Sequence, residues 1–189
     1  VLFRSTMTLF SSQPGDDGLP GSARARVMAA VMTTTLMGVF DGTMVNIALP
    51  SMAQELQASA STAVWFANGY LLAAAMTLAI FAALAARFGY RPVFLAGLTT
   101  FILASAGCAL ATTPERLISM RVLQGIGGAA TLSIAPAILR SVFPGRLLGR
   151  ILGIHALLIA SSSAIGPVLG GTILHTLSWQ WLFAINVIP

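Results

Sequence analysis

Long apolar runs separated by short connections are the feature that most constrains how this 189-residue chain can fold. A helix needs about 20 mainly apolar residues to cross the hydrocarbon core of a bilayer, and five runs reach that length. Only 8% of the residues are charged, so the chain cannot cover itself with the charged shell that keeps a soluble domain dispersed. We therefore predict an all-α membrane protein with five full spans and a truncated sixth, at residues 27–49, 62–86, 92–112, 114–139, 147–174 and 179–189.

The residues before the first span have a different composition. Residues 1–26 are polar and rich in Ser, Gly, Pro and Asp, which predicts a disordered cytoplasmic tail. Residues 1–5 resemble a translated sequencing adapter, which would place the natural start at Met7. The predicted organisation is thus a tail at 1–26 and one transmembrane helical bundle at 27–189.

Arginines alternate from one connection to the next. The net charge is +5, and all ten basic residues are arginine. One predicted face carries eight of them, against Arg116 alone on the other: Arg4, Arg24, Arg26, Arg87, Arg91, Arg140, Arg146 and Arg150. The positive-inside rule then places the N-terminus in the cytoplasm, and we expect a multi-pass protein of the bacterial plasma (inner) membrane. The arginines form short clusters and no long stripe, which argues against nucleic acid as a partner.

Tryptophans fit the same topology. Trp65, Trp179 and Trp181 fall at the predicted outer ends of their spans, where aromatic belts meet the membrane interface. Chance placement of three tryptophans is the alternative.

Motifs of soluble enzymes are absent from the sequence, which contains no GxSxG elbow, no P-loop and no HExxH pair. His155 and His175 have no second ligand at metal spacing, and Cys108 is the only cysteine. We therefore expect a protein that is not an enzyme and that has no metal and no cofactor.

Two charged residues lie inside predicted spans. A central Asp or Arg costs about 2.5–3.5 kcal/mol on insertion scales, so such residues are functional candidates by default. Asp41 in the first span and Arg121 in the fourth lie at comparable depth, to within about one helical turn. One interpretation is that Asp41 handles a proton or cation and Arg121 tunes it. The other is a polar pair that only fixes packing. Whether the two side chains touch stays open, because helix order cannot be read from spacing.

Small residues mark several helix faces. Gly125, Gly127 and Gly128 thin one stretch of the fourth span, next to Gln124 on the stripe that carries Arg121. Two pairs of glycines have the spacing of close helix approach: Gly149 with Gly153, and Gly166 with Gly170. Pro167 removes one backbone hydrogen bond inside the fifth span and predicts a kink. Tight packing alone would explain these residues, and so would a helix shaped to bend.

Four segments, in this order, resemble the major facilitator superfamily and, more narrowly, its fourteen-span drug:proton antiporters of the EmrB/QacA type. Residues 41–50 (DGTMVNIALP) match that group's span-one motif, and residues 121–128 (RVLQGIGG) match its span-four motif. Residues 166–171 (GPVLGG) match the core of the span-five antiporter motif, and residues 179–186 (WQWLFAIN) resemble the start of span six. The resemblance covers the chain from about residue 27 onwards.

One motif departs from the family's pattern. Arg87, Gly89 and Arg91 stand where the resemblance implies a gating loop that latches the cytoplasmic side through charge pairs. Ala86 replaces the acid of that pattern. The loss weakens the expected latch and leaves the fold assignment unchanged.

The resemblance implies the N-terminal half of a transporter, built from inverted three-span repeats. It implies efflux of amphipathic, often cationic small molecules against inward proton flow, with the proton gradient as the energy source. The residues it assigns to proton or substrate coupling are Asp41, Asn46, Arg121 and Gln124, and those of the antiporter motif are Gly166, Pro167, Gly170 and Gly171. Export of a metabolite is one alternative, and a truncated membrane protein that does not transport is another. We expect the chain to be inactive on its own, because a midplane site needs an opposite wall.

Overall fold

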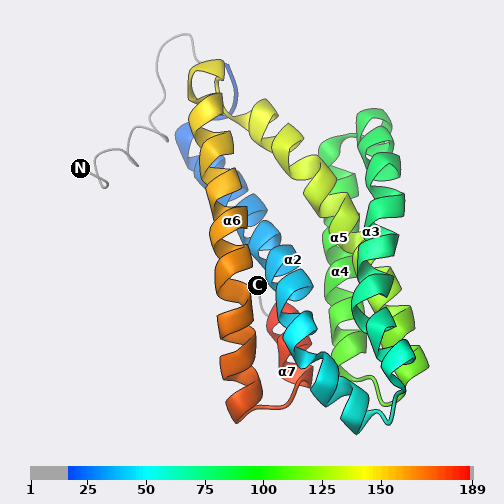
Figure 1. The fold of residues 1–189 in the computed structure, drawn as a ribbon. Helices are drawn as coiled ribbons and strands as arrows, with labels where there is room; N and C mark the ends of the chain where they lie inside the picture. The colour runs from blue at the N-terminus through cyan, green and yellow to red at the C-terminus, as the bar shows by residue number, and fades with distance from the viewer. Residues whose placement is uncertain (1–16, 188–189) are drawn as a thin grey trace.

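The computed structural model describes residues 17–187, and these form a bundle of long helices (Figure 1). In chain order the elements are α2 (Gly21–Glu55), α3 (Ala60–Phe88), α4 (Tyr90–Ala109), α5 (Pro114–Val142), α6 (Gly145–Thr176), α7 (Gln180–Ala184) and the 3₁₀ helix η1 (Ile185–Val187). Helices α2 to α6 are each long and apolar enough to cross a membrane. The predicted fold class, an all-α membrane bundle with five spans and a short sixth helix, is confirmed within the described residues.

Helix α2 is longer than the predicted span at both ends. It begins at Gly21, so residues 21–26, predicted to be disordered, are helical. There the Nε atom of the buried Arg24 donates to the Leu19 carbonyl at 2.6 Å. At the other end the helix continues through Pro50 to Glu55. Hydropathy finds only the part of a helix that suits lipid, whereas backbone hydrogen bonds extend the helix into the interface. Residues 1–16 of the predicted tail lie outside the described residues.

Helix starts follow local capping chemistry. The Ser59 side chain accepts from the Thr62 amide at 3.2 Å and caps α3. The Thr113 side chain accepts from the Arg116 amide at 3.3 Å, and Pro114 occupies the first turn of α5. Proline suits this position because the first amides of a helix have no acceptor within the helix. Helix α5 begins at Pro114, so the predicted start of this span at residue 114 is confirmed.

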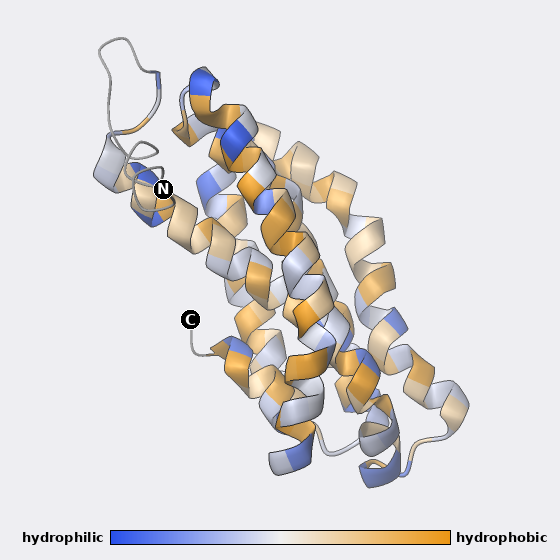
Figure 2. Cartoon of the chain, turned by 60° about the vertical axis from the view of Figure 1, so that its left-hand side comes forward, coloured by the Kyte–Doolittle hydropathy of each residue, from blue (hydrophilic) through white to orange (hydrophobic). Residues whose placement is uncertain are grey.

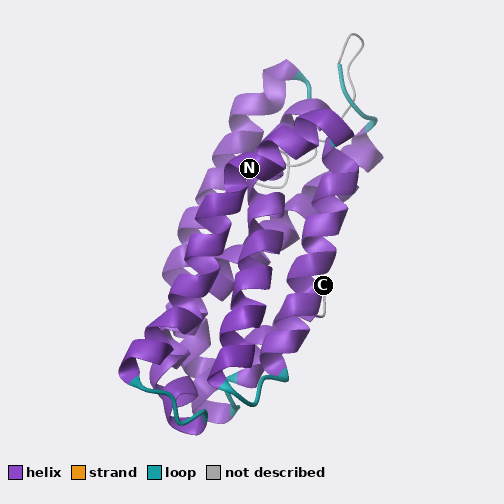
Figure 3. Ribbon diagram, turned by 90° about the vertical axis from the view of Figure 1, so that its right-hand side faces the viewer, coloured by secondary structure: helices purple, strands orange, loops and turns teal. Residues whose placement is uncertain are grey.

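The connections alternate between the two ends of the bundle (Figures 1 and 3). The start of α2 and the α3–α4 and α5–α6 connections lie at one end, and the other three connections lie at the opposite end. Figure 2 shows hydrophilic residues gathered mainly at these two ends. The first end carries the described arginines of the predicted basic face: Arg24, Arg26, Arg87, Arg91, Arg140, Arg146 and Arg150. The described arginines of the predicted basic face therefore lie at one end of the bundle, as the sequence predicts.

Helix packing repeats within the bundle. Helix α5 packs along α3 and α4, whereas α2 packs along α6 and also contacts α3 and α5. Helix α7 lies against α4. If α2, α3 and α4 are exchanged for α5, α6 and α7, the contacts α3–α5, α4–α5 and α2–α3 become the contacts α2–α6, α2–α7 and α5–α6, which the bundle also contains. The α2–α5 and α4–α7 contacts are unchanged by the exchange, and α2 and α5 begin at opposite ends. This is the arrangement of two inverted three-helix repeats.

Three apolar clusters fill the core among the described residues: a large one towards each end and a small one formed by Met37, Tyr70 and Phe101. The cluster near the α6–α7 connection includes Met52, Phe66, Leu117 and Phe183, all fully buried. The cluster near the arginine-rich end is centred on Val31, Leu139 and Ile151 and shares no residue with the first. The core also contains a buried polar network that joins five helical elements, α2, α3, α4, α5 and η1.

Candidate functional site

A buried ion pair connects the first and fourth spans. The Nη1 atom of Arg121 on α5 donates to Oδ2 of Asp41 on α2. The two residues are 1% and 2% exposed. The contact that the sequence left open is thus made. Because the two opposite charges are paired, the apolar core contains no net charge at this point.

Gln124 holds both members of the pair. Its Nε2 atom donates to Asp41 Oδ1 at 2.7 Å and to Ser105 Oγ at 2.8 Å. Its Oε1 atom accepts from Arg121 Nη1 at 2.6 Å. One turn of α5 separates Gln124 from Arg121, so both side chains leave the helix on the same face. The amide is therefore satisfied at both ends, as a buried polar group requires.

Arg121 has partners besides Asp41. Its Nε atom donates to the Phe66 carbonyl of α3 at 2.8 Å. Its guanidinium carbon lies 4.5 Å from the centre of the Tyr70 ring and 5.6 Å from that of Phe183. Such contacts with aromatic faces stabilise a desolvated guanidinium by about 2 kcal/mol. The cation thus keeps substantial support when the charge of Asp41 is neutralised.

Two residues of the network were not predicted as site residues. Asn186 in η1 donates from Nδ2 to Asp41 Oδ1 at 3.2 Å and is 2% exposed. Ser105 on α4 accepts from Gln124 and donates to the Phe101 carbonyl at 2.8 Å. Neither carries a charge, so insertion cost did not single them out. The only sequence signal for Asn186 was its place in the segment that resembles the start of span six.

Asn46, predicted as a coupling residue, lies outside this network. Its side chain is exposed, and its Nδ2 atom donates to the Gly42 carbonyl one turn earlier at 3.2 Å. It is five residues along α2 from Asp41, and this separation points the two side chains to different faces of the helix.

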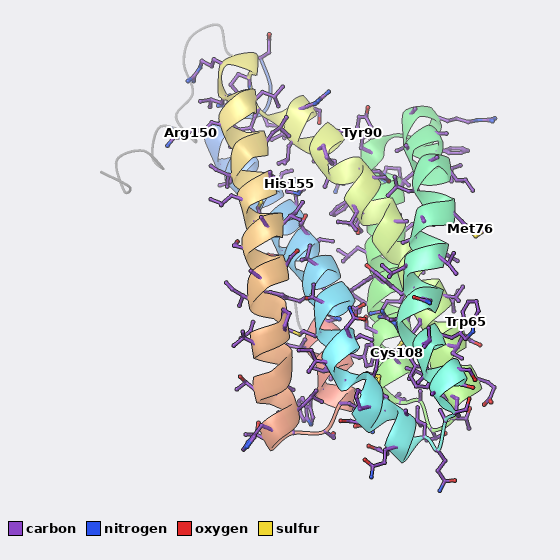
Figure 4. The ribbon with its side chains drawn as sticks, in the orientation of Figure 1. Trp65, Met76, Tyr90, Cys108, Arg150 and His155 are labelled. Carbon is purple, nitrogen blue, oxygen red and sulfur yellow. The ribbon has the colours of Figure 1, made fainter. Side chains whose placement is uncertain are left out.

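The predicted gating residues are also remote from the network. Arg87, Gly89 and Arg91 surround the α3–α4 connection, where Gly89 adopts a φ of +92° that non-glycine residues rarely take. The Arg87 guanidinium lies 5.4 Å from the ring centre of its neighbour Phe88. Figure 4 shows Tyr90 near this end of the bundle, far from Cys108, whose sulfur contacts Gln124 Oε1 at 3.6 Å.

The predicted antiporter motif forms the contact between α6 and α2. A Cβ atom at Gly166 would collide with the Thr43 hydroxyl, and one at Gly170 would lie 3.2 Å from Met44 Cα. The close approach predicted for this glycine pair is confirmed. Helix α6 continues through Pro167, and a Cβ at Gly171 would meet nothing within 4 Å.

The other predicted glycine pair makes no such contact. A Cβ at Gly149 or Gly153 would meet nothing within 4 Å among the described residues. The prediction of close packing there is wrong for this bundle, because equal spacing exists on every face of a helix and only one face meets α2.

A first prediction separates Gln124 from Asn46. Gln124→Leu should lower the free energy of unfolding by about 2–4 kcal/mol, because it removes three buried hydrogen bonds, those of Gln124 with Asp41, Ser105 and Arg121, two of them to charged groups. Asn46→Leu, a change of the same kind at an exposed position, should alter it by less than about 0.5 kcal/mol. Thermal unfolding in detergent micelles measures both. Equal losses of unfolding free energy in the two variants would indicate that Asn46 contributes to the buried network as much as Gln124 does.

Among residues 17–187, no three His, Cys, Asp or Glu side chains gather as a metal-binding group. The arrangement at Asp41 instead offers a protonatable carboxylate, one fixed cation and three neutral hydrogen-bonding side chains within an apolar core.

Comparison with known proteins identifies the family. A family model described as the Major Facilitator Superfamily matches residues 20–189. The chain is 41% identical to an uncharacterized transporter, YebQ of Escherichia coli, over 90% of this chain and 37% of that protein. It is 38% identical to the tetracenomycin C resistance and export protein of Streptomyces glaucescens, over 85% of this chain and 30% of that protein. It is 35% identical to multidrug resistance protein 3 of Bacillus subtilis, over 85% of this chain and 31% of that protein.

The chain spans about a third of the length of these curated relatives. The match nevertheless includes every described helix, and the packing has the inverted repeats of such transporters. The chain is therefore a multi-pass membrane protein that belongs to the major facilitator superfamily of transporters.

Proposed function

We propose that the chain forms the N-terminal half of a proton-coupled exporter of amphipathic, often cationic compounds. The observation that carries this proposal is the Asp41–Arg121 pair, buried with Gln124 inside an apolar bundle. Ionisable side chains at membrane depth are costly, and they recur where protons or ions are handled.

The network has the features of a two-state proton switch. When Asp41 is ionised, the pair is neutral and closed. When Asp41 binds a proton, Arg121 keeps its bonds to the Phe66 carbonyl and Gln124 Oε1 and its two aromatic neighbours. A ligand shifts such an equilibrium only by its differential affinity for the two states. The proton has that difference, because it removes one of the two charges.

Proton and cationic substrate then exclude one another. The protonated network carries one net positive charge, held by Arg121, and this repels a second cation in a medium of low dielectric constant. Release of the proton restores the carboxylate and lowers that barrier. Inward proton binding would therefore favour release of a cation that bound to the other state, which is antiport.

The substrate class rests on the relatives. Several are named as resistance or export proteins, among them those for tetracenomycin C and methylenomycin A. These names favour export of drug-like compounds over export of a metabolite.

The proposed orientation of the bundle in the membrane follows from the distribution of its arginines. We infer that the arginine-rich end faces the cytoplasm, because positive residues flanking spans are retained there. A fluorescent protein fused after Val142 should fold and fluoresce in bacterial cells, and alkaline phosphatase fused after Leu110 should be active in the periplasm. The reverse pattern would invert the topology.

Efflux of ethidium tests the function. The full-length gene product should be produced in bacteria that lack their main efflux pumps, and cells that carry it should lose ethidium faster than cells with an empty vector. Addition of a protonophore should remove the difference. Efflux that persists without a proton gradient would rule out proton coupling, and accumulation of a metabolite outside the cells without resistance to any drug would favour the alternative substrate class.

A further inference from the structure

We propose that Glu55, at the end of α2, is a positioning residue for Asp41, acting through the short helix α7. The proposal rests on the proposed function, because it assigns Glu55 a part in setting the proton affinity of Asp41.

The Glu55 carboxylate holds the start of α7. Its Oε2 atom accepts from Trp179 Nε1 and its Oε1 atom from Gln180 Nε2, both at 2.8 Å. The sequence places Trp179 in the interfacial belt, but the structure buries it to 1% exposure, whereas Trp65 and Trp181 are about half exposed. Trp179 is thus a core side chain whose single polar atom is satisfied by Glu55.

The orientation of the Gln180 amide is an independent indication that the contact with Glu55 is specific. Its Oε1 atom is buried and has no hydrogen-bond partner within residues 17–187. A buried unsatisfied acceptor costs free energy, and the amide keeps this orientation because rotating it would turn Oε1 towards the Glu55 carboxylate.

One face of the α7–η1 segment connects Glu55 to the buried pair. Trp179, Phe183 and Asn186 are spaced by four and three residues, so they share that face. The Trp179 and Phe183 rings meet edge to face at 6.1 Å. Phe183 in turn lies over the Arg121 guanidinium, and Asn186 donates to Asp41 Oδ1. A shift at the start of α7 is therefore transmitted to both members of the ion pair.

The effect on Asp41 has a defined sign. The Asn186 hydrogen bond stabilises the ionised carboxylate of Asp41, so its loss favours the protonated acid. The other titratable or charged groups around Asp41 are Arg121 on α5, Tyr70 on α3 and Cys108 on α4. At the outer end, the partners of Glu55 are uncharged, and His175 lies in the last turn of α6.

Infrared titration of the full-length gene product in lipid tests this without any substrate. The carboxylic C=O band of Asp41 is identified by its absence in Asp41→Asn. We expect its midpoint to rise by about one pH unit in Asn186→Ala and by about half a unit in Glu55→Gln and Trp179→Phe. The double variant Glu55→Gln/Asn186→Ala should move no further than Asn186→Ala alone, because both changes act through the same bond.

Glu115→Gln is the matched control, because it removes an exposed acid at the same end of the bundle without touching α7. Loss of a distant negative charge by itself makes the potential at Asp41 more positive and lowers the midpoint, opposite to the predicted shift. A Glu55→Gln midpoint that follows Glu115→Gln, or a double variant that is additive, would overturn the positioning role. If no titrating band disappears in Asp41→Asn, the proposed function fails instead.

Discussion

Asp41→Asn in the full-length gene product is expected to reduce proton-driven efflux by about 10- to 100-fold while the protein still folds. Asparagine matches the shape of aspartate, and its Oδ1 atom can still accept from Arg121, but it cannot bind a proton. Its Nδ2 atom then faces the donors Gln124 Nε2 and Asn186 Nδ2, which costs some stability. Arg121 would remain supported by the Phe66 carbonyl, Gln124 and the rings of Tyr70 and Phe183. The loss of efflux should therefore arise mainly from lost coupling, and the loss of stability should be smaller than in Arg121→Ala.

Drug resistance and ethidium efflux measure this prediction, with the amount of protein in the membrane as the reference. Arg121→Ala serves as the contrasting variant, because it leaves the buried Asp41 charge uncompensated and should destabilise the fold by about 3–5 kcal/mol. Resistance equal to wild type in Asp41→Asn would remove Asp41 from the coupling role and leave the pair as a structural one.

Gly127→Ala is the second change with a large expected effect, and it acts on the fold. A Cβ atom at Gly127 of α5 would lie 2.6 Å from the Phe101 amide nitrogen and 2.7 Å from the Gly97 carbonyl oxygen of α4. Both obstacles are backbone atoms of a helix and cannot rotate away. The two helices must separate along their contact, for which we expect a loss of about 2–3 kcal/mol of unfolding free energy.

Gly171→Ala is the control, because a Cβ at Gly171 of α6 would meet nothing within 4 Å. The single cysteine provides the assay. Cys108 is fully buried, so a maleimide dye should label it only as the bundle unfolds on heating. We expect labelling at a clearly lower temperature in Gly127→Ala and an unchanged profile in Gly171→Ala. Equal profiles would mean that α4 and α5 can move apart at little cost.

Much of the fold follows from sequence, because lipid imposes simple rules. Backbone groups in a bilayer must be paired within the segment, so a long apolar run is a helix. This is why the spans were found, and why the capping signal at Thr113 and Pro114 placed the start of α5 correctly. The ends of α2 were missed because Pro50 does not stop the helix and polar residues near an interface remain helical.

The residues of the candidate site also fall into those that the sequence predicted and those that it missed. Asp41 and Arg121 stood out because a charge in lipid is expensive wherever it lies along a helix. Asn186 and Ser105 did not, because a neutral polar side chain becomes significant only through the partner it faces. For the same reason Asn46 looked like a member of the site until its side chain was seen to bond its own helix.

The sequence by itself determined the class of solvent, the number of spans, the alternation of their ends and the two buried charges, because these depend on composition and order along one chain. Tertiary structure alone decided that the charges meet, that α6 closes on α2 through Gly166 and Gly170 and not through Gly149 and Gly153, and that Trp179 is buried. Those outcomes depend on which faces of separate helices come together. Helix periodicity fixes the faces of each helix, but only packing selects their partners.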